Sequence, residues 1–162
     1  MPTPAPRPKQ LDSPLVPRVM RYMAKCQVWV YRRTRGRIGG KWRVGAGLRK
    51  PVPTLLLEHR GRRSGQTFTT PLLYIIDGLN IVVVASQGGL PKHPQWYHNL
   101  LATPDTRVQI RAEHKLVRAR IADPQERARL WPLLVDAYAD FDNYQSWTER
   151  EIPVVILQPA DA

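Results

Sequence analysis

Apolar positions recur with two different periods along the chain, and these periods divide it into a helical first part and a sheet-forming second part. Between residues 13 and 35 the apolar side chains fall within one arc of about 140° on a helix; they are Val16, Val19, Met20, Met23, Cys26, Val30 and Tyr31. Basic side chains gather on the opposite face: Arg18, Arg21, Lys25 and Arg32. This pattern predicts an amphipathic basic helix over 13–35, with Ser13 as its N-cap and Pro14 in its first turn.

Short apolar runs after residue 53 predict six strands, at 54–59, 66–76, 79–85, 106–111, 116–121 and 152–157. Asp77-Gly78 is a strong hairpin signal between the second strand and the third. Because strands joined by short turns pair antiparallel, we expect an α+β fold. Its sheet would be an antiparallel barrel or half-barrel of about six strands, with helices packed outside.

Two further helices interrupt the predicted strands. The first follows His93-Pro94 and ends near Ala102. The second begins after Asp123, which pairs with Glu126 as a capping box around a first-turn proline. We expect this helix to turn four apolar residues toward the core: Leu130, Leu133, Leu134 and Ala137.

Composition divides the chain in the same way. Alternating prolines in residues 1–12 predict an extended, disordered basic arm, and residues 36–52 form a Gly/Arg/Lys-rich connector without a clear period. Residues 53–159 then make one barrel domain. With 43% hydrophobic residues among 162, the chain has enough apolar material for one core.

The formal net charge of +12 lies entirely in the first third of the chain. Residues 1–50 hold 13 Lys/Arg and one acid, Asp12, whereas residues 51–162 hold 12 basic and 12 acidic residues. This distribution disfavours a domain that binds nucleic acid over its whole surface. It favours a basic arm and helix attached to a neutral domain.

The basic helix has three interpretations that the sequence leaves open. It packs on the domain with a solvated basic face, or it lies on an anionic membrane surface with Tyr22 and Trp29 at the border between its faces, or it binds nucleic acid together with the basic arm. No run of about 18 apolar residues predicts a membrane span, and the first residues lack the apolar region of a signal peptide. We therefore expect a cytoplasmic protein. If the helix contacts lipid, the protein lies at the inner face of the plasma membrane.

The usual catalytic groups are missing from the sequence patterns. One cysteine, Cys26, allows no internal disulfide and no cysteine-based metal site, and the four histidines show no i, i+4 pair. We expect no metal. The sequence contains no Gly-x-Ser-x-Gly motif and no carboxylate pair in apolar surroundings, so it gives little support to a hydrolase. An enzyme with this sequence would take its chemistry from a bound cofactor.

Two loops have the composition of an anion-binding site. In the first, Gly61-Arg62-Arg63-Ser64-Gly65, glycines permit close backbone approach and the arginines offer forked donors for phosphate or carboxylate. In the second, residues 86–94, a glycine pair leads into a helix N-terminus, whose free N–H groups attract anions. Trp96 and Tyr97 follow on that helix, where they either stack on an aromatic ligand or pack in the core.

These residues occur in a recognisable order with several further motifs: Thr70-Pro71-Leu72-Leu73-Tyr74, Val84-Ala85-Ser86-Gln87-Gly88-Gly89, residues 92–100 (KHPQWYHNL) and residues 143–154 (NYQSWTEREIPV). Over residues 11–159 the chain resembles the deazaflavin-dependent nitroreductase family of actinobacteria. The resemblance implies a split β-barrel that binds coenzyme F-420, a deazaflavin with an anionic phosphate and γ-glutamyl tail.

The resemblance also implies roles for individual residues. The phosphate would be held by the first loop and the residues after it: Arg62, Arg63, Ser64, Gly65, Gln66 and Thr67. The deazaflavin pocket would be lined by Ser86, Gln87, Gly88, Gly89, Gln95, Trp96, Tyr97 and Asn99. The substrate would be positioned by Ser86, Tyr138 and Tyr144, with Phe141 beside them.

Two departures from the family bear on the substrate. Phe141 stands where the best-known nitroreductase has tyrosine, and Gln87 stands where it has lysine. We therefore expect hydride transfer from the reduced coenzyme to a hydrophobic acceptor such as a quinone, an enone or a nitro compound. The alternatives are a non-catalytic F-420 carrier and an FMN-binding oxidoreductase on the same barrel. The sequence leaves monomer and homodimer open.

Overall fold

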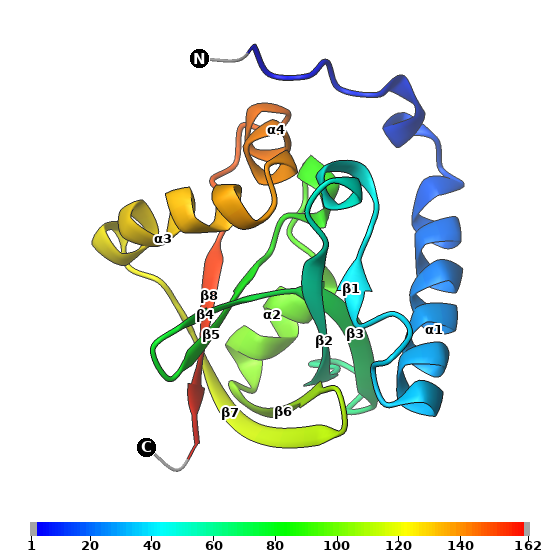
Figure 1. Cartoon of the computed structure of the whole chain (residues 1–162), viewed down its shortest axis with the longest axis vertical. Helices are drawn as coiled ribbons and strands as arrows, with labels where there is room; N and C mark the ends of the chain where they lie inside the picture. The colour runs from blue at the N-terminus through cyan, green and yellow to red at the C-terminus, as the bar shows by residue number, and fades with distance from the viewer. Residues whose placement is uncertain (1–2, 161–162) are drawn as a thin grey trace.

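The computed structural model shows a half-open antiparallel barrel with helices on both sides (Figure 1). It describes residues 3–160, except for the side chain of Leu11. The strands are β1 Lys41–Trp42, β2 Val52–Arg60, β3 Thr67–Leu73, β4 Ile75–Asp77, β5 Asn80–Val84, β6 Asp105–Ile110, β7 Glu113–Ile121 and β8 Val154–Pro159. The α-helices are α1 Val16–Thr34, α2 Gln95–Ala102, α3 Pro124–Ala137 and α4 Asp140–Ser146. Short 3₁₀ turns are η1 Lys9–Asp12, η2 Gly45–Leu48 and η3 Gln87–Gly89.

The sheet has the strand order β1-β2-β6-β7-β8-β5-β4, and β3 pairs with β2. The second predicted strand, 66–76, is interrupted at Tyr74. Its first part, β3, pairs with β2, with Thr54 opposite Leu73, and its last part, β4, pairs with β5. One bent segment therefore connects the two ends of the sheet and curls it toward a barrel. The antiparallel barrel prediction is confirmed, with eight strands instead of about six.

Two apolar cores lie on the two sides of the sheet. The inner core holds α2 against the concave face, with Leu55, Leu57 and Val83 fully buried around it. The outer core lies beneath α3 and α4. Leu130 and Leu134 of α3 are buried there as predicted, but Leu133 is 49% exposed, so its inward placement was wrong.

The capping box at the start of α3 is confirmed. The Asp123 carboxylate accepts from the backbone N–H of Glu126, and the Glu126 carboxylate accepts from the backbone N–H of Asp123. Helix α1, by contrast, begins three residues later than predicted. Ser13 is not its N-cap, because Leu15 occupies that position and Pro17 lies in the first turn.

Helix α1 is attached to the barrel through its second half. Tyr31 is fully buried; its hydroxyl donates to the carbonyl of Thr54 at 3.0 Å and accepts from the backbone N–H of Arg111 at 2.7 Å. Val28 packs with Tyr31 against Leu56 of β2. These contacts bury only one edge of the predicted apolar arc.

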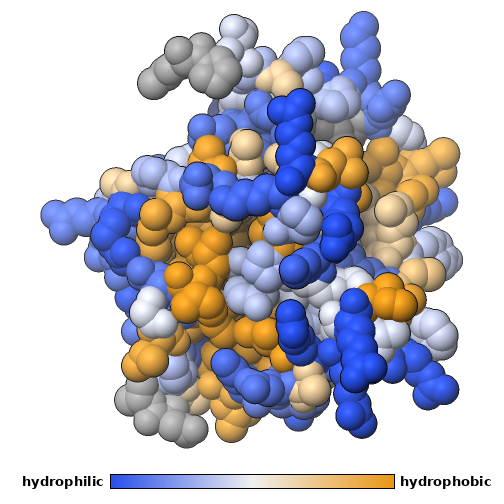
Figure 2. Space-filling view, in the orientation of Figure 1, coloured by the Kyte–Doolittle hydropathy of each residue, from blue (hydrophilic) through white to orange (hydrophobic). Residues whose placement is uncertain are grey.

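The rest of the apolar arc faces away from the barrel. Val19 is 54% exposed and Met23 is 65% exposed, and Trp29 beside them is 67% exposed. Figure 2 shows orange and pale-orange atoms at the right edge of the molecule, where Figure 1 places the first half of α1, next to blue basic side chains. Among the described residues, no helix is long and apolar enough to cross a membrane.

The two segments expected to lack regular structure make specific contacts. In the arm, of which residues 1 and 2 lie outside the described range, the backbone N–H of Ala5 donates to Asn143 at 3.1 Å and its carbonyl accepts from the Trp147 indole at 2.7 Å. The arm therefore runs from α1 across to α4 (Figure 1). In the connector, the backbone N–H of Ala46 donates to the Asp140 carboxylate at 2.9 Å.

Candidate functional site

The first anion-binding loop is a tight, exposed turn at the tip of the β2–β3 hairpin. The backbone N–H of Gly61 donates to the carbonyl of Gln66, and the N–H of Gly65 donates to the carbonyl of Gly61, both at 2.8 Å. Gly65 has a φ of 72°, a left-handed conformation that favours glycine. Arg62 and Arg63 between them are exposed, so their guanidinium groups are accessible to an anion. Ser64, Gln66 and Thr67 are exposed as well.

The turn is bound to the start of α2. The guanidinium of Arg62 donates to the side-chain oxygens of Gln95 and Asn99, each at 3.0 Å, and its backbone N–H donates to Asn99 at 3.2 Å. The structure thus places the exposed arginine turn beside a helix N-terminus. A helix N-terminus and a guanidinium both favour negative charge, which makes this the place where the predicted anion contact is geometrically feasible.

Asn99 in turn forms a hydrogen bond with a buried histidine, His59. The amide nitrogen of Asn99 and Nδ1 of His59 lie 2.9 Å apart, and Nε2 of His59 lies 2.9 Å from the Thr70 hydroxyl. Both Asn99 and His59 are about 5% exposed or less. Burial lowers the pKa of His59 to about 4, so the ring is neutral at neutral pH. His59 was not among the predicted site residues, although a histidine at an inward position of an apolar strand is a signal for a buried polar network.

The second loop contains three consecutive residues with positive φ: Gln87 at 45°, Gly88 at 61° and Gly89 at 76°. Left-handed backbone at a non-glycine residue is uncommon and occurs often at functional sites. The Gln87 side chain lies against the segment that leads into α2, 3.2 Å and 3.3 Å from the carbonyl oxygens of Lys92 and His93 when its nitrogen faces them. The first loop therefore contacts α2 through Arg62, and the second contacts the segment that leads into α2, so the two predicted loops lie at the same helix.

Arg150 fixes the second loop to the segment between α4 and β8, and it was not among the predicted site residues. Its guanidinium donates to the carbonyls of Ser86 at 2.8 Å, Leu90 at 3.0 Å and Ala85 at 3.3 Å, and to Nδ1 of His93 at 2.9 Å. Burial lowers the pKa of Arg150, yet these four acceptors favour its charged form. Arg150 lies within the motif of residues 143–154, but between Glu149 and Glu151 nothing local indicates that its side chain points inward to the second loop.

Three of the four predicted substrate residues lie where η2, α3 and α4 meet, whereas Ser86 lies in the second loop, just before η3. Tyr138 and Phe141 are buried in the outer core at 3% and 5% exposure. The Tyr138 hydroxyl lies 3.3 Å from both the Trp42 indole nitrogen and the Tyr144 hydroxyl, and burial raises its pKa. Its hydrogen-bonding capacity is thus used within the chain. Tyr144 is half-buried, and its ring packs beside that of Trp147 at 5.5 Å.

Trp96 and Tyr97 belong to the inner core, at 5% and 9% exposure. They therefore support α2 from inside the barrel in this structure, which is the packing alternative of the sequence prediction. Gln95, one residue earlier, is exposed and contacts Arg62. The polar side of α2, with Gln95, thus faces the arginine turn, and its aromatic side, with Trp96 and Tyr97, packs the helix against the inner core.

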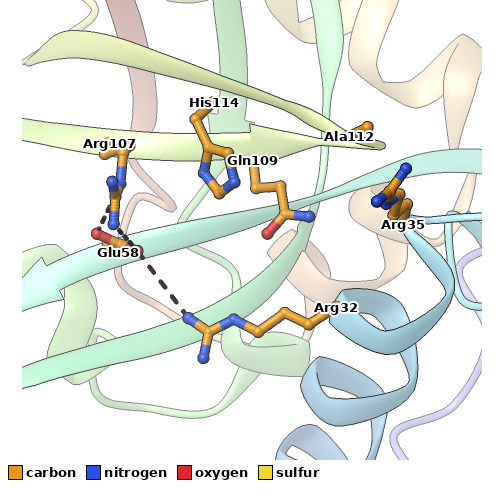
Figure 3. A pocket seen from close by; sticks show the side chains of 7 residues that line it. All are labelled: Arg32, Arg35, Glu58, Arg107, Gln109, Ala112 and His114. Atoms are coloured by element: carbon orange, nitrogen blue, oxygen red, sulfur yellow. Dashed lines mark hydrogen bonds and ion pairs between the residues drawn. The ribbon is translucent and has the colours of Figure 1, made fainter.

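A separate cleft of about 540 Å³ lies between α1 and the outer face of the sheet and contains none of the predicted site residues (Figure 3). It is lined by Arg32, Arg35, Glu58, Arg107, Gln109, Ala112 and His114. Glu58 already receives the Arg107 guanidinium at 2.9 Å and lies 4.0 Å from that of Arg32. The cleft therefore holds three arginines against one carboxylate, and it lies apart from both predicted loops. In residues 3–160, no group of three metal-ligating side chains is present.

Comparison with known proteins identifies the family. The sequence profile of the F420H(2)-dependent quinone reductases matches residues 23–159. The chain is 63% identical over 117 residues to Rv3178 of Mycobacterium tuberculosis (strain ATCC 25618 / H37Rv), whose name describes the same activity; the match covers 72% of this chain and 98% of that protein. Rv1261c, an F420H(2)-dependent quinone reductase of the same strain, is 40% identical over 131 residues, covering 79% of this chain and 84% of that protein.

A solved structure of an F420-H2 dependent reductase, FDR-A, superimposes on this chain with a TM-score of 0.61. The two are 37% identical, and the match covers 65% of this chain and 94% of that one. These matches confirm the resemblance, the split-barrel fold and the use of coenzyme F-420, and they disfavour the FMN and carrier alternatives. The chain belongs to the F420H(2)-dependent quinone reductase family and is an F-420-dependent oxidoreductase.

Proposed function

We propose that the Arg62–Arg63 turn and the N-terminus of α2 hold the phosphate of coenzyme F-420. The observation that carries this proposal is the network through which Arg62 contacts Gln95 and Asn99. It presents an exposed guanidinium next to free helix N–H groups, and both favour an anion. Arg63 follows Arg62 on the same exposed turn, and the turn of residues 61–65 contains no acidic residue.

The loop Ser86–Gly89 would border the deazaflavin. A Cβ placed on Gly88 would meet no other atom within 4 Å, so the backbone there is open to a flat ligand. Arg150 holds the carbonyl of Ser86, which keeps this loop in one conformation before the coenzyme binds. Ser86, Gln87 and Gly88 are half-buried, as expected for the wall of a site.

The acceptor would bind between this loop and α4, and we propose a quinone as its chemical class. Reduced coenzyme F-420 supplies a hydride when bound, and a quinone that takes up the hydride and a proton becomes a hydroquinone. The chain's own part is to orient the acceptor and exclude water, for which the aromatic residues of α4 are suited. Tyr144 is the residue on this side that we propose to contact the acceptor. Tyr138 and Phe141, both buried, would support it.

The test is a titration of the protein with coenzyme F-420 and, separately, with FMN, followed by tryptophan fluorescence. We expect micromolar quenching by F-420 and a much weaker response to FMN. Replacing Arg62 and Arg63 by alanine should weaken F-420 binding at least about tenfold, because two charge-assisted contacts to phosphate are lost. Equal affinity in the double variant would refute the phosphate site. Arg129→Ala is the control, because this arginine is also exposed but pairs with Asp77 and belongs to neither loop of the proposed site.

We also propose that α1 binds an anionic membrane surface. Val19, Met23 and Trp29 are exposed although they are apolar, and Arg18 and Lys25 lie on the opposite face of the same helix. An exposed helix with one apolar face and one cationic face suits an interface with anionic lipid. Lipid-soluble quinones partition into the same membrane, so the helix would hold the enzyme near such an acceptor.

A further inference from the structure

We propose that His59 is a positioning residue for the coenzyme site, because through Asn99 it orients the arginine turn that binds the phosphate. The inference rests on the proposed phosphate site and adds a buried residue of β2 that touches neither coenzyme nor substrate. Three links make up the path: Thr70 to His59, His59 to Asn99, and Asn99 to Arg62.

The hydrogen bonds fix which atoms of these side chains donate. Asn99 Oδ1 receives both the backbone N–H and the guanidinium of Arg62, at 3.2 Å and 3.0 Å, so the amide nitrogen must face His59. That nitrogen donates, and Nδ1 of His59 therefore accepts, at 2.9 Å. The histidine proton then lies on Nε2, where it is donated to the Thr70 hydroxyl at 2.9 Å.

This arrangement makes the orientation of the Asn99 amide depend on His59. An acceptor at the Nδ1 position requires the amide nitrogen, which leaves the oxygen for Arg62. Without that acceptor, the two Arg62 donors still favour the amide oxygen, but the buried amide nitrogen loses its hydrogen-bond partner. That loss favours rotation of the whole Asn99 side chain toward another acceptor. The turn would then lose both of its contacts with Asn99, and its arginines would be less well placed for phosphate.

The surroundings of His59 keep it in the accepting form. From β3, Phe68 stacks on the ring at 5.8 Å and Thr70 accepts from it, and from α2 Asn99 contacts it. All three groups are neutral. In the part of the chain that the structure describes, the charged group joined to this network is the cation Arg62, which disfavours a second positive charge on the histidine.

Two variants of nearly equal size separate the hydrogen bond from packing. In His59→Asn, Oδ1 replaces Nδ1 as an acceptor at the same distance from the backbone, whereas His59→Leu fills similar space without one. We expect His59→Leu to weaken F-420 binding about tenfold and His59→Asn to restore most of that loss. With saturating reduced coenzyme, the KM for the quinone should stay unchanged in both, because the acceptor side is not connected to this network.

The outcomes distinguish this inference from the proposal on which it rests. If Arg62→Ala/Arg63→Ala weakens coenzyme binding but His59→Leu does not, or if His59→Asn binds no better than His59→Leu, the positioning role is wrong and the phosphate site stands. If the arginine variant binds F-420 normally, the phosphate site itself is wrong. A further measurement needs no variant: nitrogen NMR of the labelled wild-type protein should show His59 protonated on Nε2 at neutral pH. Protonation on Nδ1 would overturn the inference.

Discussion

Gly89 packs directly against the backbone of Tyr144, so that a Cβ at Gly89 would lie 2.7 Å from the Tyr144 carbonyl oxygen. No real Cβ contact is that short, and backbone cannot move aside as a flexible side chain can. The loop that we assign to the deazaflavin and the helix that we assign to the acceptor thus meet at a glycine. The chain needs glycine there for two reasons, since Gly89 also has a φ of 76°.

Gly89→Ala should therefore be strongly destabilising. We expect the free energy of unfolding to fall by about 3 kcal/mol, from left-handed backbone strain together with the clash. Gly88→Ala is the matched control, because Gly88 has a φ of 61° but open space around it, and it should cost only about 1 kcal/mol. Urea unfolding of the two variants measures the difference. Equal losses would show that α4 and η3 move apart freely.

Stability should fall below pH 6.5 because of His59. The unfolded chain protonates this histidine near its ordinary pKa of 6.5, whereas the folded protein resists protonation until about pH 4. Between these values the unfolded state binds more protons, so acidification favours unfolding by up to about 3 kcal/mol, and this stability is fully present above pH 6.5. Urea unfolding between pH 7 and pH 4 tests the prediction. In His59→Asn this part of the pH dependence should disappear; parallel curves for the two proteins would contradict it.

The hydroxyl of Tyr31 should account for much of the attachment of α1. Tyr31→Phe leaves the carbonyl of Thr54 and the N–H of Arg111 without this buried partner, which should cost about 2 kcal/mol. Tyr22→Phe removes the same atom from a side chain that is 71% exposed, and its effect should stay within about 0.5 kcal/mol. Thermal unfolding of both variants is the measurement. A similar small effect of both would show that α1 is held by apolar contacts alone.

Acidic substitutions on the exposed side of α1 should abolish membrane binding. Val19→Glu together with Met23→Glu removes apolar contact and introduces charges that anionic lipid repels, and neither side chain is buried, so the fold should be retained. Flotation with vesicles of phosphatidylglycerol and with vesicles of phosphatidylcholine separates the two contributions. Leu79→Glu, at an 83% exposed position in the β4–β5 turn, is the control and should float like the wild type. Undiminished flotation of the α1 variant would exclude the proposed surface.

The sequence was most informative where one local signal determines the structure. The capping box at Asp123, the Asp77-Gly78 hairpin and the apolar runs of the strands all depend on neighbouring residues, and each predicted the observed element. The motifs around Arg62 and Ser86 also indicated both loops of the site. The single bent segment through Tyr74 was not predictable, because its two parts differ only in which distant strand they pair with.

Long-range partners explain the residues that were missed. His59 and Arg150 contact groups 40 and 64 residues away, at Asn99 and Ser86, and nothing near them in the chain indicates those partners. The face that α1 turns to the barrel was unpredictable for a similar reason. Its attachment depends on Leu56 and on the hydroxyl of Tyr31, not on the width of the apolar arc.

Among the described strands, β8 comes last along the chain and joins the two halves of the sheet, since it pairs with β5 on one side and β7 on the other. A nascent chain that ends before Val154 therefore has both halves, joined through the bent segment at Tyr74, but lacks the strand that pairs with both β5 and β7. Arg150 lies just ahead of this strand, so the loop at Ser86 acquires its clamp at the same stage of synthesis. The barrel and the coenzyme site should thus form together, in one late step after translation has passed residue 159.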